Sequence, residues 1–171
     1  MIGLEDDSLL ALINDNNDVV GSVSVSEYKK DPKKYKIFTI RVLLVSEENE
    51  VILSSSSFFE GSEYDTEYCT ILKYDEDYET ALARLCDALP PVEPRFLFRY
   101  INKDKYNVKV SLYYARIKSE EAKKYQERVI LYPSEIGTDD LIENDILFEE
   151  IGFLKTNVIP YLNLDIHNNK N

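Results

Sequence analysis

Runs of apolar residues separated by short polar turns dominate the first part of the chain and predict a series of β-strands. The runs at 9–13 and 19–25 flank the polar stretch 14–18, and this arrangement predicts a β-hairpin. Residues 37–45 are rich in β-branched side chains and almost continuously apolar, as expected for a strand that is buried on both faces. A short partner strand is expected at 51–53, after a polar turn.

Two segments depart from this strand pattern. In residues 76–89 the apolar side chains recur at helical spacing, which predicts a helix. Asp75 or Asp77 can serve as its N-cap, and the two prolines at 90–91 stop it. The charged, proline-containing stretch 29–36 predicts a connection between strands.

The second part of the chain continues with strands and ends in a helix. Residues 95–101 and 108–117 alternate between apolar and polar side chains, so they are expected to pair as a long hairpin. Residues 119–126 predict a helical turn or a loop, and 128–132 a last strand. The apolar spacing in 145–162 predicts a closing helix.

The length and composition favour a single domain inside the cell. A chain of 171 residues that are 44% hydrophobic can bury one ordinary core, so we expect one domain over 1–164 and a polar tail at 165–171. No apolar run approaches the roughly 18 residues that a membrane-spanning helix needs. Residues 1–13 carry three acidic side chains where a signal peptide would be basic, which favours a cytoplasmic protein. Cys69 and Cys86 are the two cysteines, too few for a disulfide framework or a zinc site.

The strong negative charge argues against some classes of partner. Asp and Glu outnumber Lys and Arg by 32 to 20, giving a net charge of −12. Such a charge repels nucleic-acid phosphates and anionic membranes at long range. We therefore expect a protein partner or self-association, without direct nucleic-acid or membrane binding.

Two sequence stretches resemble a known superfamily. Asp15 to Gly21 reads D-x-N-D-x-x-G, and residues 64–84 place Cys69, Glu76 and Arg84 at the spacing of a catalytic cysteine, a helix-start glutamate and a helix arginine. These motifs and the order of the elements resemble the Nudix superfamily, and in pattern its isopentenyl-diphosphate isomerases. The resemblance implies an α/β fold, with a Nudix-type mixed β-sheet flanked by helices.

The same resemblance implies that the metal-binding chemistry is missing. The Nudix box falls on residues 70–92, where Glu76, Arg84, Cys86 and Val92 fit its pattern. The positions that depart from it are Thr70, Leu85, Ala88, Leu89 and Pro91. The family uses carboxylates there to hold Mg²⁺, which prefers oxygen ligands, whereas leucine and alanine cannot bind a metal. We therefore expect no enzymatic activity, no metal and no cofactor.

The isomerase site is also incomplete. In this register Ile71 replaces a ligand histidine, while Tyr106 and Val108 replace two glutamates. The chain has one histidine, His167, and no Lys or Arg within 42–72 to hold a diphosphate.

The remaining residues suit structural or binding roles. A lone cysteine such as Cys69 is usually a small buried hydrophobic residue. Glu76 and Arg84 could form a pair that orients the helix against the preceding loop. The family's pocket side has gained apolar and aromatic groups, which form a candidate pocket or interface if they are exposed: Tyr64, Tyr68, Leu85, Leu89 and Tyr106. The acidic run at 139–150 is a second candidate surface, although a solvated loop and helix start explain it more simply.

Three hypotheses about function follow. The leading one is a non-catalytic Nudix-fold protein that acts as a protein-binding or regulatory module. The second is a metal-dependent hydrolase or isomerase on diphosphate-linked substrates, with ligands recruited from Glu60, Glu63, Glu67 or Glu127. The third is a small-molecule sensor that uses the pocket without turnover. Three or more converging carboxylates in the pocket would favour the enzyme over the first hypothesis.

Overall fold

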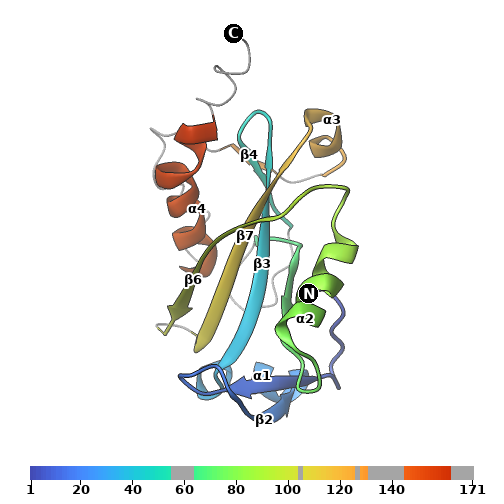
Figure 1. The fold of residues 1–171 in the computed structure, drawn as a ribbon, viewed down its shortest axis with the longest axis vertical. Helices are drawn as coiled ribbons and strands as arrows, with labels where there is room; N and C mark the ends of the chain where they lie inside the picture. The colour runs from blue at the N-terminus through green and yellow to red at the C-terminus, as the bar shows by residue number, and fades with distance from the viewer. Residues whose placement is uncertain (55–63, 104–105, 126–127, 131–144, 163–171) are drawn as a thin grey trace. The chain divides into compact units, whose positions relative to one another are not determined.

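The computed structural model describes residues 1–54, 64–103, 106–125, 128–130 and 145–162 (Figure 1). The helices are α1 (Val25–Lys30), α2 (Tyr78–Ala88), α3 (Ser119–Ala122) and α4 (Asp145–Asn157), with a 3-10 helix η1 at Pro32–Lys34. The strands are β1 (Leu9–Ile13), β2 (Val19–Ser24), β3 (Ile37–Ser46), β4 (Glu50–Ile52), β5 (Cys69–Ile71), β6 (Arg95–Asn102), β7 (Val108–Ile117) and β8 (Arg128–Ile130). No helix among the described residues is long and apolar enough to cross a membrane.

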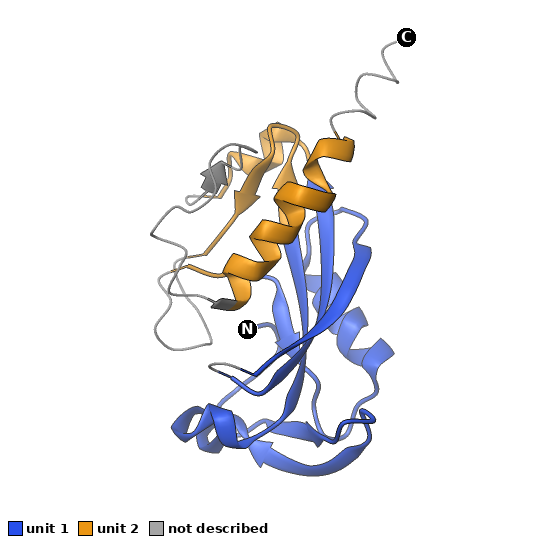
Figure 2. Cartoon of the chain, turned by 90° about the vertical axis from the view of Figure 1, so that its left-hand side faces the viewer, with its two compact units in different colours: residues 1–43, 67–116 blue, residues 44–66, 117–171 orange. Residues whose placement is uncertain are grey.

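The chain forms two compact units (Figure 2). The first unit contains Met1–Leu43 and Glu67–Arg116, and the second contains Leu44–Thr66 and Ile117–Asn171. All the residues of the sites described below, except Tyr64, belong to the first unit.

The main sheet is mixed, with the strand order β6-β7-β3-β4-β8 and with β5 paired to β3. The pairs β6–β7, β3–β4, β3–β5 and β4–β8 are antiparallel. Strands β3 and β7 run parallel, because the Ile37 N–H donates to the Asn107 carbonyl and, further along both strands, the Glu47 N–H donates to the Ile117 carbonyl. The fold is α/β, with a mixed sheet flanked by helices, as the sequence predicts.

Strand β3 is the buried strand that its apolar run predicts. All ten of its residues are buried. The predicted hairpin of β6 and β7 is present, with a register shift between Phe96 and Phe98. Strand β5, a partner of β3 at Thr39, Ile40 and Arg41, is an addition to the sequence prediction.

The first hairpin, β1–β2, is also present, and its turn is built from asparagine chemistry. The Asn14 Oδ1 accepts hydrogen bonds from the backbone N–H groups of Asn16 and Asp18, at 2.9 and 3.0 Å. Asn17 adopts a φ of 67°, a left-handed conformation that asparagine tolerates better than most residues. This turn fixes the position of Asp15 between the two strands.

Helix α2 begins at Tyr78 because Asp77 is its N-cap. The Asp77 carboxylate accepts from the Thr80 N–H at 2.8 Å, so the first helical residue follows it. Ala81 and Leu85 are buried, and the helix packs against β5. The sequence places the start two residues earlier at Glu76, but the Glu76 carboxylate turns back to accept from the Lys73 N–H.

Helix α1 occupies residues that the sequence predicts as the end of the strand at 19–25 and the start of the connection at 29–36. Ser24 ends β2 and caps α1, its hydroxyl accepting from the Glu27 N–H at 3.2 Å. Val25 therefore begins a helix, and its side chain is buried together with that of Tyr28. Polar capping by Ser24 overrides the apolar alternation of 19–25.

The second unit contains β4, β8, α3 and α4. Strand β4 pairs with β8, and α3 provides the short helical turn expected after β7. Helix α4 lies within the predicted closing helix, and Ile146, Leu147 and Leu154 have no exposed surface. The predicted tail at 165–171 and the acidic segment up to residue 144 lie outside the described residues.

Candidate functional site

Glu76 and Arg84, two of the four residues at which the sequence resembles the Nudix box, form an ion pair at the side of α2. Their side chains are 10% and 19% exposed, respectively, so the pair is largely shielded from water. Arg84 Nη1 donates to the Ile2 carbonyl at 2.7 Å and to the Thr70 hydroxyl, while Nη2 donates to Glu76 and, at 3.4 Å, to the Ile71 carbonyl. We call the set formed by Ile2, Thr70, Ile71, Glu76 and Arg84 the Arg84 cluster.

The Arg84 cluster ties three segments together. Thr70, in β5, donates its hydroxyl to the Ile2 carbonyl at 2.8 Å, and Glu76 accepts from the Lys73 N–H at 2.9 Å. Gly3 has a φ of +68°, and a Cβ atom there would lie 2.6 Å from the Arg84 Cδ. The cluster therefore holds the N-terminal segment and β5 against α2, with both terminal nitrogens of Arg84 engaged in this task.

Cys69, which the resemblance places at a catalytic position, lies in β5 and is 3% exposed. Its Sγ is 3.7 Å from the Met1 Sδ, and its carbonyl accepts from the Ile2 N–H at 2.9 Å. Cys86 is half-buried, and burial, with a smaller contribution from Asp87, raises the pKa of its thiol. A raised pKa keeps the thiol protonated and lowers its nucleophilicity at neutral pH.

The structure does not gather the other sequence candidates into one exposed surface. Leu85, Tyr106 and Tyr68 are 0%, 4% and 9% exposed, so they belong to the core. Leu89, the residue after α2, is half-buried. Tyr64 is half-buried and belongs to the second unit, whereas the others belong to the first.

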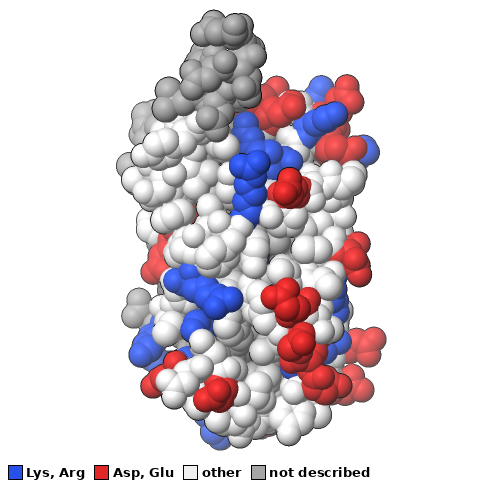
Figure 3. Space-filling model, viewed as in Figure 1, with Lys and Arg blue, Asp and Glu red and all other residues white. Residues whose placement is uncertain are grey.

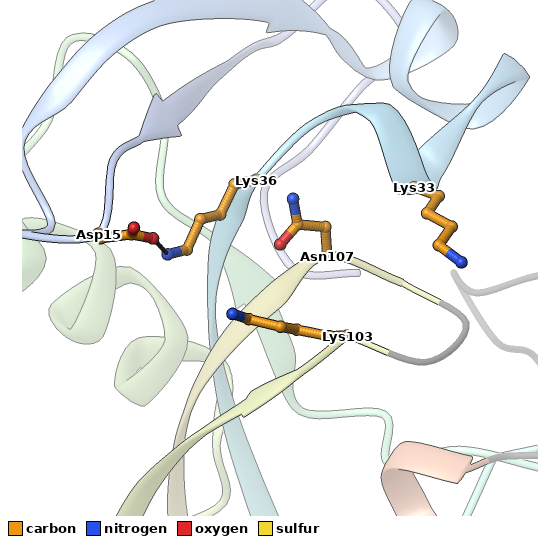
Figure 4. A pocket seen from close by; sticks show the side chains of 5 residues that line it. All are labelled: Asp15, Lys33, Lys36, Lys103 and Asn107. Carbon is orange, nitrogen blue, oxygen red and sulfur yellow. Dashed lines mark hydrogen bonds and ion pairs between the residues drawn. The ribbon is translucent and has the colours of Figure 1, made fainter.

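A lysine-lined pocket lies elsewhere in the first unit, at the ends of several strands (Figure 4). It has a volume of about 310 Å³ and is lined by Asp15, Lys33, Lys36, Lys103 and Asn107. The Lys36 Nζ donates to the Asp15 carboxylate at 2.7 Å, and Figure 4 shows the Lys103 side chain extending toward this pair. We call this cavity the lysine pocket.

Each lining residue reaches the lysine pocket for a simple topological reason. Asp15 lies in the β1–β2 turn, Lys33 in η1, and Lys36 directly before β3. Lys103 follows β6 and Asn107 precedes β7, so the β6–β7 connection supplies both. Sequence reasoning missed this pocket because its residues come from three separate connections, β1–β2, α1–β3 and β6–β7. The signal that could have found it is that all three lysines lie in predicted connections between strands.

Positive charge gathers around the lysine pocket although the protein is acidic. Lys36 contributes to lowering the pKa of Lys109, after partial burial of Lys109 and the nearby Arg99 guanidinium. Lys103 and Lys36 both lower the pKa of Asp15, with the Lys36 hydrogen bond as the main cause. In the view of Figure 3 acidic side chains gather over α2, whereas basic ones lie over β6.

The lysine pocket is not the carboxylate-rich pocket that the enzyme hypothesis requires. Asp15 is the one carboxylate among the described residues that line it. In the part of the chain that the structure describes, no three His, Cys, Asp or Glu side chains are grouped closely enough to hold a metal ion. Of the alternative ligands considered above, Glu67 is exposed, and Glu60, Glu63 and Glu127 lie outside the described residues.

Comparisons with known proteins identify a distant structural similarity. No family model and no curated protein matches the chain. The crystal structure of DR0079 from Deinococcus radiodurans aligns with a TM-score of 0.47 and 18% sequence identity, over 64% of this chain and 72% of that chain. The solution NMR structure of DR0079, described as a hypothetical Nudix protein, aligns with a TM-score of 0.36 and 17% identity, over 77% of this chain and 75% of that chain. These similarities assign no residue role to this chain.

Proposed function

We propose that this chain is a non-catalytic, cytoplasmic domain of the Nudix type that acts by binding another protein. The observation that carries the proposal is the Arg84 cluster. In it, the surviving box residues Glu76 and Arg84 bond to each other and to the backbone of neighbouring segments.

A metal ion would have to compete with these internal contacts. The Glu76 carboxylate already accepts from Arg84 and from the Lys73 N–H. Taking it as a metal ligand would leave the Arg84 guanidinium, 19% exposed, without its counter-charge. Losing one partner of a largely buried pair costs about 3–5 kcal/mol, which opposes such a rearrangement. The neighbouring box positions, Leu85, Ala88 and Leu89, supply no replacement oxygen.

The proposed partner surface is β6, which is the terminal strand of the sheet in the described part of the chain. Phe96 and Ile101 in β6 are 52% and 44% exposed, which is high for large apolar side chains. The Phe96 ring makes an edge contact with Tyr113 at 5.4 Å between centroids, and the Arg99 guanidinium lies 5.9 Å from the Phe96 centroid. Aromatic residues and arginine are the side chains that most often carry binding energy in protein interfaces. A terminal strand also offers backbone groups for pairing with another chain.

An activity assay tests the non-catalytic part of the proposal. We expect no hydrolysis of nucleoside diphosphate-linked compounds and no isopentenyl-diphosphate isomerisation in the presence of Mg²⁺, Mn²⁺ or Zn²⁺. The control is the heat-killed protein, and the matched variant is Glu76→Gln, which keeps the size of the side chain. Turnover by the wild type that is lost in folded Glu76→Gln would support the metal-dependent enzyme instead.

A binding assay tests the proposed surface. The partner is recovered from the native host, or self-association is measured by sedimentation velocity, and the wild type is then compared with Ile101→Asp. The matched control is Val20→Asp, at a 64% exposed position in β2 of the same unit. We expect Ile101→Asp to weaken the complex by about tenfold, which corresponds to roughly 1.4 kcal/mol, and Val20→Asp to leave it unchanged. Equal effects of the two variants would exclude β6 as the interface.

A further inference from the structure

The lysine pocket is an open cavity with an excess of cations among its described lining residues. Three of these five residues are lysines and one is an aspartate, so their charged groups sum to +2. The whole chain has a net charge of −12, so this local sign is opposite to that of the protein. Such a local excess of positive charge attracts anions, and strand-end loops are frequent positions for binding residues.

The single carboxylate does not neutralise the lysine pocket. Asp15 pairs with Lys36, whose side chain is 12% exposed, while the Asp15 side chain is 95% exposed. Lys33 and Lys103 form no ion pair with any residue that the structure describes. The ammonium groups of these two lysines are therefore available to a ligand.

Among the paired groups of the pocket, the Lys36 ammonium is in the least favourable environment. An ammonium group that is largely shielded from water is unfavourable unless other groups satisfy it. Its one carboxylate partner lies almost wholly in solvent, where water weakens the attraction. A second anion in the pocket would give the Lys36 ammonium a further partner.

The other features of the pocket fit a phosphate group. Asn107 supplies a side-chain amide, which can donate to an oxygen that the lysines do not reach. The volume of about 310 Å³ lies at the small end of ligand pockets, which span roughly 300–1,000 Å³. A monophosphate with a small organic group fits this size better than a dinucleotide does.

We propose that the lysine pocket binds the phosphate group of a small phosphorylated molecule. Lys36 and Lys103 would donate to the phosphate oxygens, with Asn107 as a neutral donor, whereas Lys33, whose ammonium group lies on the other side of Asn107 in Figure 4, would add positive charge at the edge of the pocket. Asp15 would compete with the ligand for Lys36. This site is separate from the Arg84 cluster and from β6, so it stands independently of whether the chain is catalytic or binds a protein.

The test titrates inorganic phosphate into the isotopically labelled full chain at low ionic strength and follows backbone amide shifts by NMR. Saturable shifts confined to residues near Lys33, Lys36 and Asn107 are expected. Acetate at the same ionic strength is the control for a carboxylate of single charge. A chain that shows no saturable shift with phosphate, or an equal response to acetate, would overturn the proposal.

Matched lysine variants make the test specific. Lys103→Gln removes one proposed donor, and we expect it to weaken phosphate binding by about tenfold, whereas Lys33→Gln removes only a nearby charge and should have a smaller effect. Lys34→Gln is the control, because Lys34 is the exposed neighbour of Lys33 in η1 and does not line the pocket. If Lys34→Gln weakens binding as much as Lys103→Gln, the attraction is a general effect of charge and the proposed site is wrong.

Asp15→Asn is expected to strengthen phosphate binding, whereas the lysine variants are expected to weaken it. Removing the competing carboxylate should tighten phosphate binding by roughly threefold, a gain that misfolding cannot produce. Weaker binding to Asp15→Asn would contradict the proposed role of Asp15. An acidic peptide such as tetraglutamate is titrated in parallel. Saturable binding of this peptide without saturable phosphate binding would mean that the pocket binds an acidic protein segment and not a small phosphorylated molecule.

Discussion

The Arg84 cluster and the lysine pocket both pair a basic side chain with a carboxylate in the first unit, but the two pairs differ in their surroundings. Glu76 and Arg84 are 10% and 19% exposed, and both terminal nitrogens of Arg84 bond to the chain itself. In the lysine pocket, Asp15 is 95% exposed, and two further lysines have no described ionic partner. The first arrangement uses its charges to hold segments together, whereas the second leaves charge available for a ligand.

The difference shows why residue identity alone does not locate a binding site. The sequence resemblance singles out Glu76 and Arg84, yet their contacts are with Ile2, Thr70, Ile71 and Lys73 of the same chain. The resemblance does not single out the lysines of the pocket, yet all three line one cavity. The available donors, more than the motif, indicate where a ligand can bind.

Removing the cation of the Arg84 cluster should give the largest effect on stability. Arg84→Met keeps much of the side-chain volume but leaves the shielded Glu76 carboxylate without its cation. We expect the free energy of unfolding to fall by about 3–5 kcal/mol, measured by denaturant titration with circular dichroism. Arg95→Met, at an exposed position in β6, is the control and should change it by less than about 0.5 kcal/mol.

Removing the anion should have a smaller effect, because part of the hydrogen bonding survives. In Glu76→Gln the amide oxygen can still accept from the Lys73 N–H, while the charge opposite Arg84 is lost. The expected loss is about 1.5–3 kcal/mol, the usual value for a hydrogen bond to a charged group. Glu79→Gln in the exposed first turn of α2 is the control. Equal losses in the two variants would mean that Glu76 behaves as a surface residue.

The strand and helix pattern could be predicted from the sequence because it depends on local periodicity. The continuous apolar run of β3 and the helical spacing of α2 specify their elements without reference to the rest of the chain. Strand β5 has only three residues, Cys69–Ile71, which is too short for a period to be visible, and its pairing with β3 is a tertiary contact. Helix α1 was hidden because Ser24 can end a strand or cap a helix equally well.

The candidate sites could be predicted less well, because burial and convergence depend on tertiary structure. The Glu76–Arg84 pair could be anticipated from the family resemblance, which implies a pair that orients the helix against the preceding loop. The sequence does not show that Tyr106 is buried. It also gives no sign that Lys103 and Lys36 meet, since the parallel pairing of β3 with β7 brings their strand ends together.

The close approach of the N-terminal segment to Arg84 should make Gly3 sensitive to substitution. Gly3→Ala places a Cβ 2.6 Å from the Arg84 Cδ at a φ of +68°. The left-handed conformation alone costs about 1–2 kcal/mol for a residue with a Cβ. The control is Gly152→Ala in α4, where a Cβ meets nothing within 4 Å. That variant should stabilise the protein by up to about 1 kcal/mol, because alanine favours a helix.

Thermal unfolding of the two glycine variants tests whether the N-terminal segment packs on Arg84. A lower melting temperature for Gly3→Ala and an equal or higher one for Gly152→Ala would match the structure. If Gly3→Ala has no effect, the N-terminal segment does not pack on Arg84, and the Arg84 cluster loses its contact with Ile2.

The Asp15–Lys36 pair should give the smallest effect on stability, and its dependence on pH and salt separates it from the Arg84 cluster. Hydrogen bonding and attraction from Lys36 lower the pKa of Asp15 below its ordinary value of 3.8. A carboxyl group with a lowered pKa in the folded state stabilises the protein above its unfolded pKa, and this contribution is lost as the pH falls through the folded value. Asp15→Asn should therefore be slightly less stable than the wild type at pH 7, and the difference should disappear below the folded pKa of Asp15.

Because Asp15 is exposed, about 0.5 M NaCl should also remove the difference, whereas the loss caused by Arg84→Met should persist in the same salt. Unfolding titrations of the three proteins at pH 7 and at stepwise lower pH, with and without salt, measure both trends. If salt removes the Arg84→Met effect as readily as the Asp15→Asn effect, the two pairs are equally exposed in solution and the contrast between the Arg84 cluster and the lysine pocket is wrong.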